Sequence, residues 1–367
     1  MNAQLKAISG FLLVTTMATT AALAKPFNDP GLGSIWHYRS EKYYGINLDQ
    51  TYKEFKNFKA EPVIVAILDT GVDYNHEDLK NNIWVNTKEI PNNAIDDDGN
   101  GYIDDIHGIN TVDRDSKGRA TNQVMDSHFH GTFMAGIIAG EQNNKIGTAG
   151  IASNAKIMIL KMVSADKDET DKDVAEALLY AARNGAKVIN CSFAKYENEQ
   201  DNLIYTTIKK IRDEYGVLVL AAAGNLNSNN DIKPMYPANF ELDNLISVAG
   251  HDQVGELAHF IGSKYSNYGL KTVHLTAPSV GVYSTVTNSP QGYKYESYYG
   301  TSVATPIVSA VAAELFSRFP KLKYNEVRDI ILNSVTKNKK IENKIMTGGI
   351  LNMYNAFKLA EKINQGL

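Results

Sequence analysis

The stretch VAILDTGVD occupies residues 65–73, and its first four residues are apolar. A run of this kind predicts a buried strand that delivers Asp69 to its carboxyl end. In open α/β sheets, ligand and catalytic sites form beyond the carboxyl ends of the strands. Asp69 is therefore a candidate site residue, and the capping of a helix or turn is the alternative use of an Asp at this position.

Other short apolar runs continue this pattern along the chain. They predict buried strands at residues 62–68, 156–163, 186–192, 216–223, 245–249 and 272–277. Amphipathic patterns predict helices at residues 171–184 and 201–215, and each is followed by a glycine and then by a strand. Strands that alternate with helices predict an α/β fold in which helices cover both faces of a mostly parallel central sheet.

The composition is that of a globular protein. Of the 367 residues, 43% are hydrophobic and 21% are charged, which is enough apolar material for a sizeable core. The formal net charge is -4, so no basic surface is predicted and nucleic acid is set aside as a partner. No repeat, linker or charge block marks a second domain. We expect residues 25–367 to form a single domain, with no appended C-terminal domain, and the protein to be a monomer.

The first 24 residues have the features of a secretory signal peptide. Lys6 precedes an apolar run at residues 8–17, and the sequence Ala22-Leu23-Ala24 predicts cleavage before Lys25. A membrane anchor, the alternative, needs about 20 continuous apolar residues, and threonines interrupt this segment. We therefore expect a secreted or periplasmic protein with no stable membrane insertion.

Export permits disulfide bonds, yet Cys191 is the only cysteine of the chain. It lies in a predicted buried strand, and we expect a packed thiol rather than a nucleophile. The stability of the exported protein must then come from another source.

Two further stretches carry candidate catalytic side chains. The stretch HFHGTFMAGIIAG at residues 128–140 places His130 at the start of a helix of small residues, and the stretch YGTSVATP at residues 299–306 places Ser302 at the start of an apolar helix. Gly300 allows a close approach of the backbone, and the helix dipole favours negative charge that develops near Ser302. Taken singly, the two residues have ordinary alternatives, a structural histidine and a helix N-cap.

Together, Asp69, His130 and Ser302 are the components of acyl-transfer catalysis. A hydroxyl becomes a nucleophile when a base takes its proton, and a buried carboxylate stabilises the imidazolium that forms. The order Asp, His, Ser, with the stretches DTGVD, HGT, GTSVATP and AAAGN around these residues, resembles the subtilisin family of serine proteases. The resemblance runs from about residue 28 to about residue 363 and implies a three-layer subtilisin-like fold.

The resemblance also implies a role for each matching residue. Ser302 corresponds to the nucleophile, His130 to the base and Asp69 to the carboxylate that holds it. Asn225, in the stretch AAAGN, corresponds to the side chain that donates to the oxyanion. The implied activity is that of a serine endopeptidase acting on extended polypeptides.

Six residues are implied to bind substrate: Ser192, Phe193, Ala194, Ala222, Gly224 and Met235. The first three match the edge that pairs with an extended peptide, and the stretch 222–224 matches the other wall of the primary pocket. Ala194 stands where the family usually has glycine, so it crowds the approaching substrate backbone. Met235 matches the pocket floor, and its flexible apolar side chain predicts a preference for apolar residues of medium size.

A structural calcium ion is predicted at residues 96–105, which read DDDGNGYIDD. Oxygen ligands at alternate positions and a glycine at the bend suit calcium, although His107 replaces the glutamate that would complete an EF-hand. A plain acidic turn is the alternative. Asp78 resembles the carboxylate of another calcium site in the family. The expected ligands in the loop are Asp96, Asp98, Asn100 and either Asp104 or Asp105.

Other departures and matches affect the site less. His76 and His128 lack the Gly-Thr flank and are expected to be structural, since no pair of histidines has a spacing that suits zinc. Phe133 stands where the family often has a second histidine, which should alter packing rather than the catalytic residues.

Two alternatives stay open from the sequence. Only residues 25–28 separate the signal peptide from the part that resembles a mature enzyme, so either the protein folds without a propeptide, aided by calcium, or a folding helper or inhibitor acts in trans. The rival to a peptidase is a non-catalytic subtilase-like protein that binds extended peptides. The complete set of catalytic residues favours the peptidase.

Overall fold

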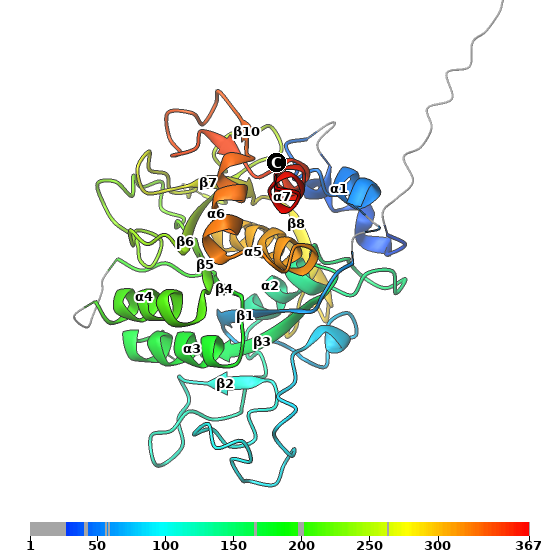
Figure 1. Cartoon of the computed structure of the whole chain (residues 1–367). Coiled ribbons are helices and arrows are strands. Elements are labelled where there is room, and N and C mark those ends of the chain that lie inside the picture. The colour runs from blue at the N-terminus through cyan, green and yellow to red at the C-terminus, as the bar shows by residue number, and fades with distance from the viewer. Residues whose placement is uncertain are drawn as a thin grey trace, which may run out of the picture.

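The computed structural model describes residues 27–39, 43–55, 57, 59–164, 167–196, 202–262 and 264–366. The predicted signal peptide, and its cleavage between Ala24 and Lys25, lie outside these residues. Figure 1 shows a central sheet with helices packed against it and, at one end of the molecule, a region of irregular loops next to strand β2.

A nine-stranded sheet forms the centre of the described part of the chain, in the order β10-β11-β7-β6-β5-β4-β1-β3-β2. Every strand pair is parallel except β10 with β11. The strands are β1 (Val63–Asp69), β2 (Gly108–Asn110), β3 (Ala155–Lys161), β4 (Val188–Cys191), β5 (Leu218–Ala222), β6 (Leu245–His251), β7 (Leu275–Pro278), β10 (Thr336–Lys337) and β11 (Gly349–Ile350).

Helices cover both faces of this sheet (Figure 1). One core contains side chains of α1, α2, α5, α6 and α7, and the other contains side chains of α3 and α4. The helices are α1 (Leu48–Phe55), α2 (His130–Ala139), α3 (Asp171–Arg183), α4 (Leu203–Tyr215), α5 (Thr301–Arg318), α6 (Tyr324–Asn333) and α7 (Met353–Asn364).

The short elements are three 3-10 helices and a hairpin that lies outside the central sheet. The 3-10 helices are η1 (Pro30–Gly33), η2 (Trp36–Tyr38) and η3 (Lys80–Asn82). Strands β8 (Val282–Thr285) and β9 (Tyr295–Tyr298) form the antiparallel hairpin.

The central strands alternate between the two cores. In β1, Val65 and Ile67 face the core that contains α5, whereas Ala66 and Leu68 face the core that contains α3. A strand that is buried on both faces is apolar at consecutive positions, which is the pattern that residues 65–68 show in the sequence. The fold is therefore the predicted three-layer α/β arrangement.

The six predicted strands are present, as are the two predicted amphipathic helices and the two helices predicted to start at His130 and Ser302, with ends displaced by a few residues. The strand predicted at residues 272–277 is β7, which begins three residues later, and the helix predicted at residues 171–184 is α3. Strands β2, β8, β9, β10 and β11, and helices α1, α6 and α7, were not predicted. The five strands are two to four residues long, which is too short for a periodic pattern to identify them.

Cys191 is buried, as expected, at the end of β4. Burial raises the pKa of its thiol, so the thiol stays protonated at neutral pH. No helix in the described part of the chain has both the length and the apolar composition that a membrane span requires.

Candidate active site

Three neighbouring strands bring the candidate residues to one edge of the sheet. Strands β5, β4 and β1 are adjacent, and Cys191 of β4 lies level with Leu68 of β1 and with Ala221 of β5. Parallel strands end on the same side, so Asp69, Ser192 and the loop after β5 meet beyond this edge. The site therefore lies where the carboxyl ends of the strands predicted it.

Asp69 holds the imidazole of His130. His130 is the first residue of α2, and its Nδ1 lies 2.8 Å from Asp69 Oδ1 and 2.9 Å from Oδ2. Asp69 Oδ1 also accepts a hydrogen bond from Thr70 N at 2.8 Å. The Asp69 side chain is 4% exposed and that of His130 is 28% exposed, so the imidazole separates a buried carboxylate from solvent.

This pairing sets the protonation of the imidazole. Burial by itself lowers the pKa of His130, but the charge and the hydrogen bond of Asp69, together with the charge of Asp126, outweigh it and raise the pKa above the ordinary value of 6.5. With Nδ1 bound to Asp69, Nε2 is the nitrogen left for proton transfer. The arrangement suits a general base that is held and stabilised by a carboxylate.

Ser302 lies in the first turn of α5, after Gly300. Gly300 has a φ of 138°, a conformation that side chains with a Cβ rarely adopt. The Ser302 carbonyl accepts a hydrogen bond from Ser192 Oγ at 2.8 Å, which ties the start of α5 to the end of β4. Among the described residues no hydrogen bond joins the Ser302 hydroxyl to His130. Such bonds often form only when substrate closes the site.

Asn225 borders the same space as Ser302. Its Oδ1 accepts hydrogen bonds from Thr301 N at 2.9 Å and from Thr301 Oγ1 at 3.0 Å. No hydrogen bond among the described residues uses its Nδ2, which can therefore donate to a ligand. A Cβ placed on Gly300 would lie 3.0 Å from Ser302 Oγ and 3.6 Å from Asn225 Nδ2. The hydroxyl and the amide donor therefore flank one small space, which is the arrangement that an oxyanion site needs.

The residues predicted to pair with substrate leave β4 as an irregular segment. Within the described residues, no backbone hydrogen bond uses the N–H or C=O groups of Phe193 and Ala194. The chain is held again only at Lys195, which forms an antiparallel bridge with Tyr236. Unpaired backbone groups of this kind can accept an extended peptide as an added strand.

The residues predicted to line the primary pocket also lie together. Ala222 ends β5, and Gly224 follows it with a φ of 106°. Met235 is buried, and its Cε lies 3.4 Å from the place that a Cβ on Gly224 would take. The structure thus brings the predicted wall and the predicted floor into contact.

Two residues that shape this region were not predicted from the sequence. Thr301 orients Asn225, and Asn267 fixes the loop that carries it, since Asn267 Oδ1 accepts from Leu226 N and Ser228 N while its Nδ2 donates to Ala223 O. Thr301 adjoins the nucleophile and so could have been suspected. Asn267 lies 41 residues beyond Leu226, and no motif surrounds it.

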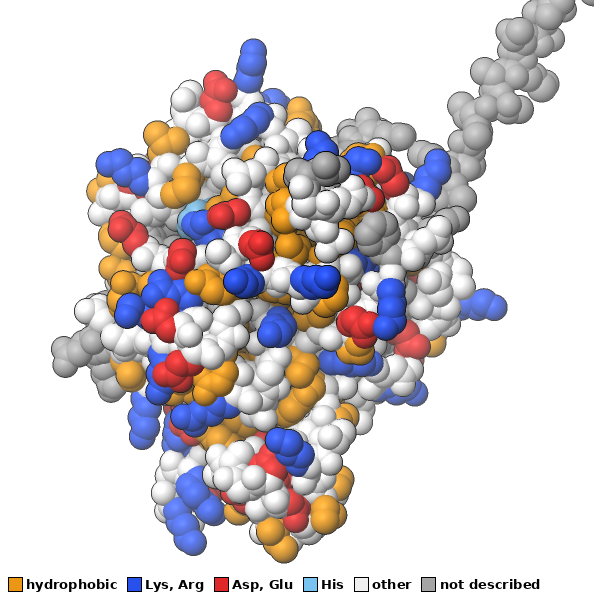
Figure 2. Space-filling model, viewed as in Figure 1, with side chains coloured by type: hydrophobic (Ala, Val, Ile, Leu, Met, Phe, Trp, Pro, Cys, Tyr) orange, Lys and Arg blue, Asp and Glu red, His pale blue; other side chains and the backbone are white. Residues whose placement is uncertain are grey.

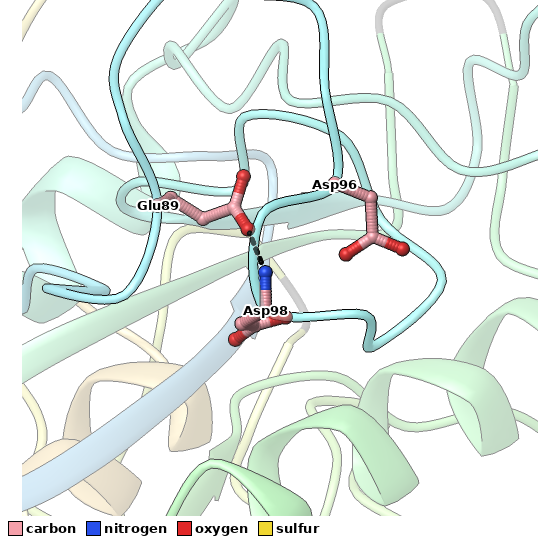
Figure 3. A group of neighbouring side chains, drawn as sticks. All are labelled: Glu89, Asp96 and Asp98. Carbon is pink, nitrogen blue, oxygen red and sulfur yellow. Dashed lines mark hydrogen bonds between the residues drawn. The ribbon is translucent and has the colours of Figure 1, made fainter.

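The acidic loop folds around three converging carboxylates (Figure 3). Glu89, Asp96 and Asp98 each present an oxygen, and these oxygens lie within 4.8 Å of one another. Glu89 was not predicted because it lies outside the DDDGNGYIDD stretch. Its two oxygens accept hydrogen bonds from Asp98 N and Asp104 N, which hold both halves of the loop.

The other predicted ligands of this loop have protein partners. Asp104 accepts from the backbone of Asn93 and Ala94. Asp105 accepts from Asn100 Nδ2 and from the hydroxyl of Tyr180. The structure therefore brings together Asp96, Asp98 and Glu89, and it directs Asp104, Asp105 and Asn100 into the hydrogen bonds that shape the loop.

Asp78 lies in a separate buried site next to residues 144–148. Its carboxylate accepts from Asn144 Nδ2 at 2.7 Å and from Thr148 N at 3.0 Å. Burial raises its pKa to about 7, although these hydrogen bonds oppose the shift. Asp29 binds the same loop, since its carboxylate accepts hydrogen bonds from Asn143 N and Asn144 N.

His76, His128 and Phe133 have structural contacts, as expected. His76 is buried, and its Nδ1 accepts from Asp78 N. The ring of His128 lies against the ring of Phe129, with centroids 4.3 Å apart. Phe133 is fully buried and makes an edge-to-face contact with Tyr298.

Comparison with known proteins gives consistent matches. The family described as "Subtilase family" matches residues 60–349. "Subtilisin-like protease 1" of Plasmodium falciparum (isolate 3D7) is 32% identical over 329 residues, which are 86% of this chain and 46% of that protein. "Thermophilic serine proteinase" of Bacillus sp. (strain AK1) is 35% identical over 256 residues, which are 69% of this chain and 52% of that protein.

A solved structure shows the same fold. A protease from Pseudoalteromonas arctica PAMC 21717 superposes with a TM-score of 0.73 at 25% sequence identity, covering 92% of this chain and 100% of the other. The chain spans about half the length of the curated relatives described above.

Proposed function

The chain belongs to the subtilase family, and we propose that it is an exported serine endopeptidase that cleaves extended polypeptides through an acyl-enzyme on Ser302. The observation that carries this proposal is the Asp69–His130 pair at the start of α2, which packs against α5, the helix whose first turn contains Ser302. The orientation of Asn225 by Thr301 supports it.

Each residue has a defined part in the proposed reaction. His130 Nε2 takes the proton of the Ser302 hydroxyl as the oxygen attacks the peptide carbonyl, and Asp69 stabilises the imidazolium. Asn225 Nδ2 and the backbone N–H of Ser302 donate to the oxyanion. His130 then protonates the leaving amine, and water, activated by the same imidazole, hydrolyses the ester on Ser302.

The test is the reaction of the purified protein with a fluorophosphonate probe. We expect the wild type to be labelled and Ser302→Ala not to be labelled, because only an activated serine attacks the probe at a useful rate. Ser116→Ala is the matched control, since Ser116 is an exposed serine away from the site, and it should be labelled like the wild type. A folded wild type that is not labelled would contradict the peptidase and favour a non-catalytic peptide-binding protein.

For the primary pocket we propose a preference for apolar side chains of medium size. Met235 is buried against the place where a Gly224 side chain would point, and it offers no charge to a substrate residue. A peptide library should show cleavage after apolar residues. Cleavage chiefly after Lys, Arg or Glu would refute the proposed preference without affecting the proposed reaction.

We also propose that the acidic loop binds a structural calcium ion through Glu89, Asp96 and Asp98. Hard oxygen ligands suit calcium, and three converging carboxylates repel one another unless a cation balances their charge. Burial and the charges of Asp105 and Asp98 raise the pKa of Glu89, and a bound cation would oppose this shift. Asp78 is proposed as a ligand at a second site, as the family resemblance implied.

Export is also proposed, and this part of the proposal rests on the signal-like sequence of residues 1–24. Cleavage before Lys25 would leave the described residues in the mature protein. An extended polypeptide is the proposed substrate.

A further inference from the structure

Asp126 is a second buried carboxylate close to His130, and the mechanism above does not use it. It is 3% exposed. Its Oδ1 accepts hydrogen bonds from Thr70 Oγ1 and His128 N, both at 2.9 Å. Its Oδ2 accepts from Thr132 N at 3.0 Å and from Thr132 Oγ1 at 2.6 Å. The four donors are uncharged groups, and hydrogen bonds of this kind favour the ionised form of a carboxylate.

These hydrogen bonds lie on both sides of His130 in the sequence. Gly131 N donates to Thr70 Oγ1 at 3.0 Å, so Thr70 links the residue after the histidine to Asp126. Thr70 also follows Asp69 directly. The end of β1 therefore acts on the histidine through two consecutive residues. Asp69 holds the imidazole, and Thr70 binds the carboxylate of Asp126, which fixes the backbone around His130.

Other contacts fix Asp126 itself. Lys161, at the end of β3, donates from Nζ to Met125 O at 3.1 Å and to Ser127 Oγ at 3.2 Å. Asn288 Nδ2 donates to the carbonyl of Asp126 at 3.0 Å. The segment before α2 is thus held on each side of the carboxylate, which leaves Asp126 little freedom to move.

Charged and titratable groups reach this region from several elements. The first turn of α5 contributes no charged side chain. Burial lowers the pKa of His130, and the charges of Asp69 and Asp126 raise it. Burial also raises the pKa of Asp126, against its hydrogen bonds. The charged and titratable groups of this region are Asp69 at the end of β1, Asp126 and His128 before α2, Lys161 at the end of β3, and the thiol of Cys191 at the end of β4.

We propose that Asp126 is a positioning residue for the general base: its hydrogen bonds fix the backbone around His130, and its negative charge stabilises the imidazolium. The inference rests on the proposed peptidase function. Two buried carboxylates then act on one imidazole, with Asp69 in contact with the ring and Asp126 acting through the backbone and through space.

The test separates the charge from the geometry by a pair of variants. Asp126→Asn removes the charge, and Asp126→Glu keeps the charge but displaces it. Removal of a nearby negative charge lowers the pKa of His130. The neutral imidazole, which acts as the base, then persists to lower pH. We expect the acid limb of the kcat/KM profile to move to lower pH by roughly 0.5 to 1 unit in D126N, and to stay in place in D126E while kcat falls.

Thr70→Val is the variant with the smallest effect on folding, because it removes one hydroxyl and keeps both carboxylates. We expect a lower kcat with the same acid limb as the wild type. An unchanged kcat in T70V would overturn the positioning role, and an unchanged acid limb in D126N would overturn the electrostatic role.

A titration that needs no activity completes the test. In the Ser302→Ala background, the imidazole of His130 can be titrated by NMR, with His130→Ala used to assign its signal. The midpoint should be lower in the double variant S302A/D126N than in S302A, and equal midpoints would contradict the inference. This readout does not depend on catalysis, so a failure of the proposed peptidase activity stays distinguishable from a failure of this inference.

Discussion

Asn225 gains its proposed function from one neighbouring residue. An asparagine amide in a loop can turn either of its two ends towards a ligand. Here Thr301 donates to Oδ1 from both its N–H and its hydroxyl, so only Nδ2 is left to face the space beside Ser302. The same hydroxyl accepts from Gly224 N at 3.1 Å, which links the pocket wall to the oxyanion site.

We therefore predict that Thr301→Val lowers kcat by roughly fivefold to tenfold, because the loss of one hydrogen bond of about 1 kcal/mol loosens the amide. KM should change little, since the amide acts on the oxyanion rather than on the bound peptide. Steady-state kinetics on a peptide substrate measures both. Thr301→Ser keeps the hydroxyl and is the matched control, and full activity in T301V would show that Asn225 needs no such orientation.

The acidic loop is an element without a regular strand or helix. It runs between η3 and β2, and it lies at one end of the molecule in Figure 1. Its hydrogen bonds are donated mainly by backbone N–H groups to carboxylates, as at Asp96, which accepts from Asn100 N and Gly101 N. The stability of a loop that is held by carboxylates depends on the cation that balances their negative charge.

Removal of calcium should accordingly lower the stability of the protein. A ligand present at 100 times its Kd stabilises the folded state by about 2.7 kcal/mol, so we expect a chelator to lower Tm by roughly 5 °C. Glu89→Gln should respond less to the chelator than the wild type does. Differential scanning calorimetry with and without chelator measures this response.

Asp97→Asn provides the control for this experiment. Asp97 is exposed, belongs to the same loop and accepts from Ile90 N and Asn93 Nδ2, but it is not part of the converging group. Its variant should respond to the chelator like the wild type. An equal response of E89Q and wild type would place the calcium effect elsewhere, for example at Asp78.

The whole molecule buries several imidazoles as neutral groups. Burial lowers the pKa of His37 to about 3, that of His251 to about 4 and that of His274 to about 3. His251 Nε2 lies 2.8 Å from Tyr44 O, and its Nδ1 lies 3.0 Å from Thr276 Oγ1, so one nitrogen donates and the other accepts. On the face seen in Figure 2, by contrast, Lys and Arg side chains alternate with Asp and Glu.

These buried histidines predict a loss of stability in acid. The unfolded chain binds protons below about pH 6.5, whereas the folded chain does so only near pH 3 to 4, so stability present above pH 6.5 is lost as the pH falls. At pH 5 the loss is about 2 kcal/mol for each imidazole. Urea unfolding of His251→Gln should show a smaller loss between pH 7 and pH 5 than the wild type shows.

His259→Gln is the control for this prediction, because His259 is exposed. Asp78 acts in the opposite direction, since its raised pKa favours the folded state as the pH falls, but it is common to all the proteins compared. An equal pH dependence of stability in H251Q and wild type would show that the burial of His251 does not contribute to the loss of stability in acid.

Much of the fold and the residues of the proposed catalytic site could be predicted from the sequence. Strands buried on both faces are apolar at consecutive positions, as at residues 65–68, and such local patterns need no knowledge of the fold. Asp69, His130 and Ser302 were identified because their flanking stretches match a known family. The alternation of strands and helices then predicted a parallel sheet and placed Asp69 at the edge where sites form.

The tertiary structure alone decided which distant side chains meet. Asn225 and Thr301 are 76 residues apart, and Thr70 and Asp126 are 56 residues apart. Glu89 joins Asp96 and Asp98 only because the loop turns back on itself. The physical reason is that periodicity reports how each segment is buried, whereas contacts between segments depend on the order of the strands and the path of the loops. In this protein, those contacts orient Asn225, bring the carboxylates of the acidic loop together and place a second buried carboxylate near His130.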